Sequence, residues 1–406
     1  AVELAPENPI PMATLAKVCV AKRDFDGAYA VYEDLLQITP DNAIARFAFA
    51  SLCASRGEYE KAVELLDAID EGDPAYVQAR THIAELYDAM GNSEAASAEF
   101  ERLLASDPDA ANVTAGKFQH LARAQDQDAM EELARETIQR DPESALGHLM
   151  LSDVYAARGA WAQAAAEIRT ALDAQPDAAR LWFRLGVLSS NAGRIQDALE
   201  ALMRARELQP AFDEATLGAA RILAQTGKGD EALELCLEVL ERNPDNLNAN
   251  LAMADIKATL GLDSEAEFLY RGLMASHAQF LVPYLRLAAL YERNGEPEKV
   301  QEIFQAALEA APEVPELYLE YGAFWERANQ QDQARQQYMH ALELAPDNPR
   351  IQDILARHAL NTGDLTDAEQ RLRARVDQAP EDLAARLNLA IVLEQAGKTE
   401  EAAKLL

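Results

Sequence analysis

The residues that could perform chemistry are few and scattered along the chain. Catalysis requires titratable groups that converge in a pocket, and a helical metal site requires two ligands three or four residues apart. The six histidines never show that spacing: His82, His120, His148, His277, His340 and His358. The sequence also contains no phosphate-binding loop, dinucleotide fingerprint, nucleophile elbow or His-Glu zinc helix. We therefore expect no enzyme activity, no metal site and no cofactor in these 406 residues.

The three cysteines show no chemical pattern either. An odd number of cysteines does not form a complete set of disulfides, and the spacing of Cys19, Cys53 and Cys236 matches no zinc site. Because free cysteine is among the residue types most often buried, we expect all three to be small core residues.

Charge and composition argue against several classes of partner. The chain carries 69 Asp and Glu against 37 Lys and Arg, a formal net charge of −32. Phosphate contacts need concentrated positive charge, so we expect neither nucleic acid nor an anionic membrane as the main partner. No apolar run approaches the roughly 18 residues of a membrane span, so we expect no direct membrane insertion. No signal-peptide pattern is visible, and the compartment, cytoplasmic or periplasmic, stays open.

A proline recurs every 34 residues from Pro6 to Pro380, and only Ala278 interrupts this ladder. Proline cannot donate the helical hydrogen bond, so it ends one helix and opens the next unit. A fixed period of this length predicts a chain of stacked two-helix repeats.

A glycine recurs with the same period from Gly57 to Gly397, with Gln125 and Asn329 as exceptions. It falls between two helical patterns, where the end of the first helix needs a residue in the left-handed conformation. We expect this position to form the turn inside each helix pair.

An alanine recurs likewise from Ala28 to Ala402, with Met130 and Val300 as exceptions. We expect it where the two helices of a pair come close, because a larger side chain there would push them apart.

Together, the three ladders resemble the tetratricopeptide-repeat family over essentially the whole chain. The resemblance implies an all-α, right-handed superhelical solenoid of antiparallel helix pairs. With the closing proline as position 32, residues 9–382 form eleven repeats and residues 383–406 an incomplete twelfth. The eleven start at residues 9, 43, 77, 111, 145, 179, 213, 247, 281, 315 and 349. Residues 1–8 resemble the tail of a preceding repeat, so we expect the chain to be a segment of a longer array.

One repeat, residues 111–144, departs from the pattern. Phe118 stands where the family has a small residue, Gln125 replaces the glycine and Met130 replaces the alanine. One interpretation is drift, in which neighbours repack around the larger side chains. The other is a hinge or a change in the superhelical path.

In this family the concave groove is built by positions 2, 5, 6, 9, 12 and 13 of the first helix, which we call the inner face. Position 5 is apolar in six consecutive repeats: Leu149, Phe183, Leu217, Leu251, Leu285 and Leu319. Such a stripe could receive the apolar side of a partner helix or an extended peptide. The alternative is ordinary packing between repeats, because position 5 is half-packed in this family and often large.

Arginines accompany the stripe, and between residues 179 and 382 they nearly balance the acids of the inner face. The candidate binding residues among them are Arg180, Arg184, Arg221, Arg286 and Arg293. Of these, Arg180, Arg184 and Arg221 suggest a basic cluster able to grip a carboxylate with two hydrogen bonds. The alternative is that they cover apolar surface or pair with Glu214.

The resemblance therefore implies a non-catalytic scaffold that binds a protein or peptide ligand in the groove. The members that clamp a chaperone's acidic tail carry Lys at position 5 and Asn at position 9, and this sequence has neither. Its Ala-rich composition and excess of Arg over Lys resemble bacterial arrays in assembly, secretion or polysaccharide-export proteins. The alternative is the substrate-docking arm of a larger enzyme such as a transferase. The oligomeric state is left open.

Overall fold

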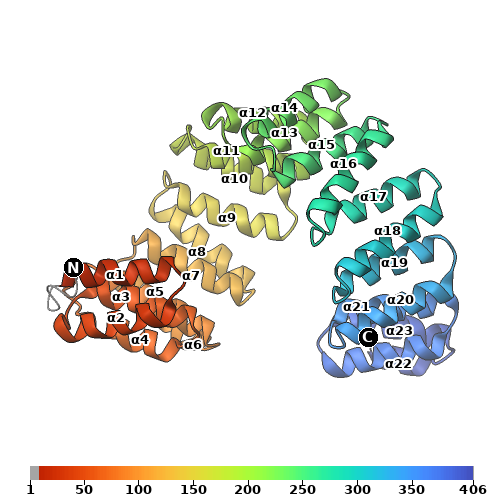
Figure 1. Cartoon of the computed structure of the whole chain (residues 1–406). Coiled ribbons are helices and arrows are strands. Elements are labelled where there is room, and N and C mark those ends of the chain that lie inside the picture. Colours follow the sequence, from red (N-terminus) through yellow and green to blue (C-terminus); the bar gives the residue numbers. More distant parts are fainter. Residues whose placement is uncertain (1–8, 406) are drawn as a thin grey trace. The chain divides into compact units, whose positions relative to one another are not determined.

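The computed structural model describes residues 9–405 and, from residue 10 onward, their side chains. Within that range the chain is all-helical, with 24 helices in consecutive pairs and no strand (Figure 1). The tail of a preceding repeat, expected at residues 1–8, lies outside the described residues.

Each pair consists of a first helix and a second helix joined by a short turn. The first helices are α1 (Pro9–Ala21), α3 (Ala43–Ser55), α5 (Tyr76–Ala89), α7 (Ala111–Arg123), α9 (Ala145–Ala157), α11 (Ala179–Asn191), α13 (Asp213–Gln225), α15 (Leu247–Thr259), α17 (Val282–Arg293), α19 (Pro315–Arg327), α21 (Pro349–Thr362) and α23 (Leu383–Gln395). The second helices are α2 (Phe25–Ile38), α4 (Tyr59–Asp67), α6 (Ser93–Ser106), α8 (Gln127–Arg140), α10 (Trp161–Ala174), α12 (Ile195–Leu208), α14 (Gly229–Arg242), α16 (Asp263–Ser276), α18 (Pro297–Ala310), α20 (Gln331–Leu344), α22 (Leu365–Gln378) and α24 (Thr399–Leu405).

The chain divides into two compact units, one ending at Ala215 and one beginning at Thr216. The division falls inside α13 and not in the irregular repeat at residues 111–144.

The turn inside each pair depends on one residue in the left-handed conformation. Nine glycines of the 34-residue ladder have φ between 71° and 82°. At Gly57, for example, the Gly57 amide donates to Ala54 and the Glu58 amide donates to Cys53, which satisfies carbonyls at the end of α3. Asparagines after the closing proline cap the next helix, as Asn42 does for the amide of Ala45 at 3.0 Å.

The alanine ladder marks the closest approach of paired helices. Ala198 is fully buried in α12, and it faces Gly186 of α11. A Cβ atom at Gly186 would lie 2.6 Å from Cγ of Leu202 and 3.2 Å from the Ala198 carbonyl oxygen. The two helices therefore leave no space for larger residues at this crossing.

The irregular repeat keeps its two helices and buries its larger side chains. Phe118 and Met130 share one apolar cluster with Met150 and Leu151 of α9. Gly116 gives α7 room beside α6, because a Cβ atom there would lie 2.8 Å from the Phe100 ring. These contacts favour repacking over a break in the array.

Candidate functional site

The six position-5 residues differ in how much surface they offer a partner. In the second unit Leu217, Leu251 and Leu319 are buried, with exposed fractions of 4%, 7% and 6%, whereas Leu285 is half-buried. In the first unit Leu149 and Phe183 are half-buried, and the Phe183 ring packs on Phe212 with 5.0 Å between centroids. Much of the stripe is therefore used for packing between helices.

The three arginines expected to form one cluster are divided between the two units. Arg180 and Arg184 lie in the first unit, and Arg221 lies in the second. Arg180 is exposed, whereas Arg184 is ion-paired with Asp153 of α9. Burial lowers the pKa of Arg184 below its ordinary value, although a guanidinium stays protonated in proteins. Among the described residues, neither Arg180 nor Arg184 pairs with Glu214.

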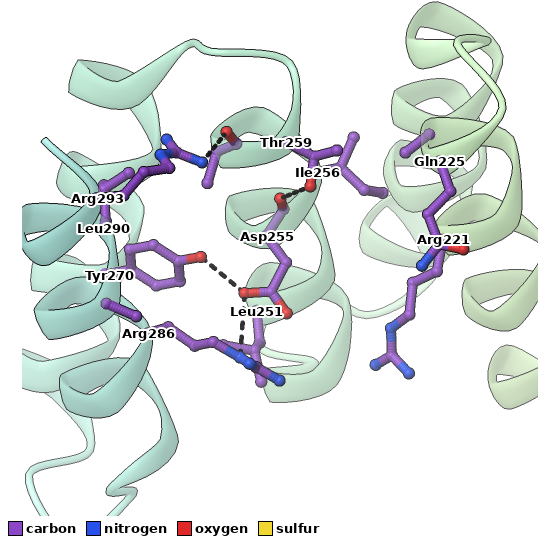
Figure 2. Close-up of a pocket in the computed structure, with 13 residues that line it drawn as sticks. Arg221, Gln225, Leu251, Asp255, Ile256, Thr259, Tyr270, Arg286, Leu290 and Arg293 are labelled. Atoms are coloured by element: carbon purple, nitrogen blue, oxygen red, sulfur yellow. Dashed lines mark hydrogen bonds and ion pairs between the residues drawn. The ribbon is translucent and has the colours of Figure 1, made fainter. Parts of the chain in front are cut away.

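A pocket of about 520 Å³ in the second unit brings four of the candidate residues together (Figure 2). It is formed by α13, α15 and α17, with one side chain from α16. The candidate residues that line it are Arg221, Leu251, Arg286 and Arg293. We call this the α13–α17 pocket.

A tyrosine–aspartate hydrogen bond forms the centre of the α13–α17 pocket. The Tyr270 hydroxyl donates to Oδ1 of Asp255 at 2.7 Å, and Nε of Arg286 lies 3.6 Å from the same oxygen. Burial, and then the hydrogen bond to Asp255, raise the pKa of Tyr270 far above its ordinary value. Tyr270 therefore remains a neutral donor and holds the Asp255 carboxylate in place.

The pocket's arginines differ in what they already bind. Arg293 donates to the Ala258 carbonyl at 3.0 Å and pairs with Asp263 at 2.6 Å, so its orientation is fixed. Arg286 is exposed and pairs with the same Asp255 carboxylate that accepts the hydrogen bond from Tyr270. Arg221 is exposed, and among the described residues it has no hydrogen bond or ion pair; Figure 2 shows it across α15 from Arg286. The pocket thus contains a guanidinium with free donors.

Family models described as tetratricopeptide repeat match most of the chain. One model matches residues 20–75, 54–117 and 191–256, a second matches 281–324, and a third matches 149–189 and 355–406. The chain belongs to the tetratricopeptide-repeat family. Its scaffold is of a type typical of protein–protein interaction and generally non-catalytic.

Several solved structures are similar to the chain at low sequence identity. Yeast Tom70 is 19% identical over 98% of this chain and 90% of its own, with a TM-score of 0.46. A tetratricopeptide repeat protein from Parabacteroides merdae is 14% identical over 70% of this chain and 98% of its own, with a TM-score of 0.46. Human IFIT1, solved as a dimer with m7Gppp-AAAA, is 15% identical over 89% of this chain and 88% of its own, with a TM-score of 0.44. No curated protein sequence matches the chain significantly. At these identities and TM-scores, nothing about those proteins' ligands carries over to this chain.

The Tyr270–Asp255 pair was missed by the sequence reasoning. Tyr270 stands at position 24 of its repeat, in the second helix, and Asp255 stands at position 9 on the inner face. An acid at position 9 in the same repeat as a tyrosine at position 24 is the signal that could have found it.

Two buried histidines bind acids of the preceding repeat. His120 and His358 are both buried. Nδ1 of His120 lies 2.6 Å from Oδ1 of Asp88, and Nδ1 of His358 lies 3.1 Å from Oε1 of Glu326. These pairs join successive repeats and leave neither histidine open to a substrate.

The cysteines differ in burial. Cys53 and Cys236 are buried as predicted, whereas Cys19 is only half-buried. Burial raises the pKa of both buried thiols to about 11, so they remain protonated. Within residues 9–405, no three His, Cys, Asp or Glu side chains gather as a metal site. None of the helices described has the length and apolar character that crossing a membrane requires.

Two further hollows are lined mainly by first helices, one in each unit, and a third, of about 510 Å³, lies between Trp182 of α11 and the second helices α10 and α12. In the first unit, Val20 and Phe25 line a hollow of about 560 Å³ that also touches Arg56. In the second unit, Asp353 and Arg357 line a smaller one of about 200 Å³. The α13–α17 pocket differs from all three in combining three arginines with a central carboxylate.

Proposed function

We propose that the chain is a non-catalytic scaffold that binds polypeptide segments on the inner face. The observation that carries this proposal is the α13–α17 pocket, which draws its lining from three successive first helices. An extended peptide that crosses successive repeats would meet one first helix after another, as repeat arrays allow.

The chemistry of the pocket suits a polypeptide. Leu251 and Leu290 supply apolar surface, and the Arg286 and Arg221 side chains supply hydrogen-bond donors. Pockets that combine apolar walls with a few placed polar groups bind ligands and fix their orientation. A role in an assembly, secretion or polysaccharide-export protein is part of the same proposal, supported by the composition of 28 Arg against 9 Lys.

The test is selection of peptides from a displayed random library by the full chain, followed by binding measurements with a blocked pocket. Ala289 is exposed and lines the pocket, so Ala289→Trp should fill it without disturbing the core. Ala275 is exposed on α16 outside the lining, and Ala275→Trp is the matched control.

We expect the selected peptides to lose binding to Ala289→Trp and to keep it with Ala275→Trp. If no peptide is enriched, or if both variants bind the enriched peptides like the native chain, the proposal is wrong.

A further inference from the structure

We propose that the α13–α17 pocket recognises an acidic side chain, Glu or Asp, followed by an apolar residue in the bound polypeptide. This inference rests on the proposed function, because it names the partner's chemistry at the same site. It goes beyond it in predicting that a single carboxylate decides which segment binds.

The charge of the pocket favours an anion although the chain as a whole is strongly acidic. Three arginines and one aspartate are its charged lining residues, and Asp263 already neutralises Arg293. Asp255, which pairs with Arg286, is the only acid among the lining residues, and Arg221 has no acid paired with it among the described residues. Within the lining this leaves one positive charge, that of Arg221, without an acid partner, and a ligand carboxylate would balance it.

Arg221 is the side chain expected to bind the ligand carboxylate first. Its guanidinium has no partner among the described residues, so binding breaks no existing ion pair. A guanidinium binds a carboxylate through two parallel hydrogen bonds, and such charge-assisted bonds are the strong ones. Because Arg221 is exposed, an ion pair formed there can stay partly hydrated, which limits its desolvation penalty.

Arg286 is expected to move from Asp255 toward the ligand. Its Nε lies 3.6 Å from Asp255 Oδ1, an ion-pair separation longer than a good hydrogen bond. Asp255 keeps its hydrogen bond from Tyr270 when Arg286 turns away, so its carboxylate is not left unsatisfied. Asp255 and the ligand therefore compete for one guanidinium.

The apolar residue of the ligand is expected to lie against Leu251 and Leu290. Both are buried and present only an edge to the pocket, whose other aliphatic lining residues are Ala224, Ile256, Ala258 and Ala289. A carboxylate beside an apolar side chain matches this combination of surfaces.

A long polyanion is a poorer occupant than a short acidic peptide. With a formal net charge of −32, the chain repels an extended phosphate backbone outside the pocket. A single carboxylate needs only the local charge of the two arginines. We therefore expect RNA to bind more weakly than an acidic peptide. Inorganic phosphate should also bind more weakly, because it has no apolar group to lie against Leu251 and Leu290.

The experiment starts from a peptide that the full chain selects from the displayed random library. Three synthetic versions of it, differing at one position, are compared by their equilibrium binding to the full chain. The three carry Glu, Gln or Lys before a leucine. We expect the Glu peptide to bind about tenfold more tightly than the Gln peptide, since the charge-assisted bonds are lost in the second. The Lys peptide should bind most weakly.

Two variants with opposite expected effects identify the responsible residues. Arg221→Gln should reduce the preference for Glu over Gln to about twofold or less. Asp255→Asn retains an acceptor for Tyr270 and removes the competing charge, so the Glu peptide should bind about threefold more tightly. As a folding control, the melting temperature of each variant is compared with that of the native protein before binding is measured.

The outcomes separate this inference from the proposed function. Equal binding of the Glu and Gln peptides, blocked by Ala289→Trp, overturns the carboxylate preference and leaves peptide binding in place. Displacement of the Glu peptide by inorganic phosphate at equal concentration overturns the assignment to a peptide carboxylate. If no peptide shows binding that Ala289→Trp abolishes, both proposals are wrong.

Discussion

At the scale of single residues, three turn positions adopt a backbone conformation that favours glycine. Arg23, Gln125 and Asn329 have φ of 61°, 58° and 58° at the turn where the other repeats place glycine. The left-handed conformation costs most non-glycine residues about 1–2 kcal/mol. Because glycine loses more entropy on folding, Gln125→Gly should stabilise the chain by about 0.5–1 kcal/mol, measured by urea unfolding.

Asn329→Gly is the matched control for that change. Asparagine tolerates the left-handed conformation better than glutamine, so its replacement should gain less. Equal gains at both positions, or a loss at Gln125, would contradict the assignment of strain to this turn.

A second prediction at this scale concerns the carboxylate that joins two repeats. Asp88 hydrogen-bonds buried His120 at 2.6 Å and accepts from Arg123 at 2.9 Å. Asp88→Ala leaves the His120 ring without a partner, which should cost about 1–3 kcal/mol of unfolding free energy. Arg123→Ala removes only an exposed partner and should cost less than about 1 kcal/mol. The two costs are compared in urea, and similar values would show that His120 does not depend on Asp88.

At the scale of elements, the size of a few side chains sets the distance between the two helices of a pair. Ala198→Leu places a large side chain into the contact between α11 and α12, where Gly186 already approaches Leu202. Overpacking of this kind costs about 1–3 kcal/mol. Met130→Leu, in the irregular repeat, nearly conserves volume and should cost less. Equal destabilisation in urea would mean that α7 and α8 pack as closely as the other pairs.

The helix pairs could be predicted because their signals are local. A left-handed turn residue such as Gly57 and a helix-ending proline such as Pro40 act on their own neighbours in sequence. The site could be predicted only in part. Whether Leu251 is buried and Leu285 half-buried depends on side chains from adjacent repeats. The Asp255–Tyr270 bond likewise depends on the rotation of α16 against α15, which no local pattern records.

At the scale of the whole molecule, the dominant property is the formal net charge of −32. We interpret it as a source of solubility, because like charges keep neighbouring molecules apart. Repulsion between exposed carboxylates is screened within about 10 Å at 0.1 M salt. Thermal stability should therefore level off by a few tenths molar KCl. A melting temperature that rises steadily to about 2 M KCl, but not with sucrose, would indicate adaptation to high salt instead.

The central claim is that polypeptides bind on the inner face. Hydrogen–deuterium exchange of the full chain, with and without a library-selected peptide, tests this most directly. The account predicts new protection in the first helices α13, α15 and α17, whose side chains line the pocket together with Tyr270 of α16. Protection confined to the second helices α14, α16 and α18 would contradict it.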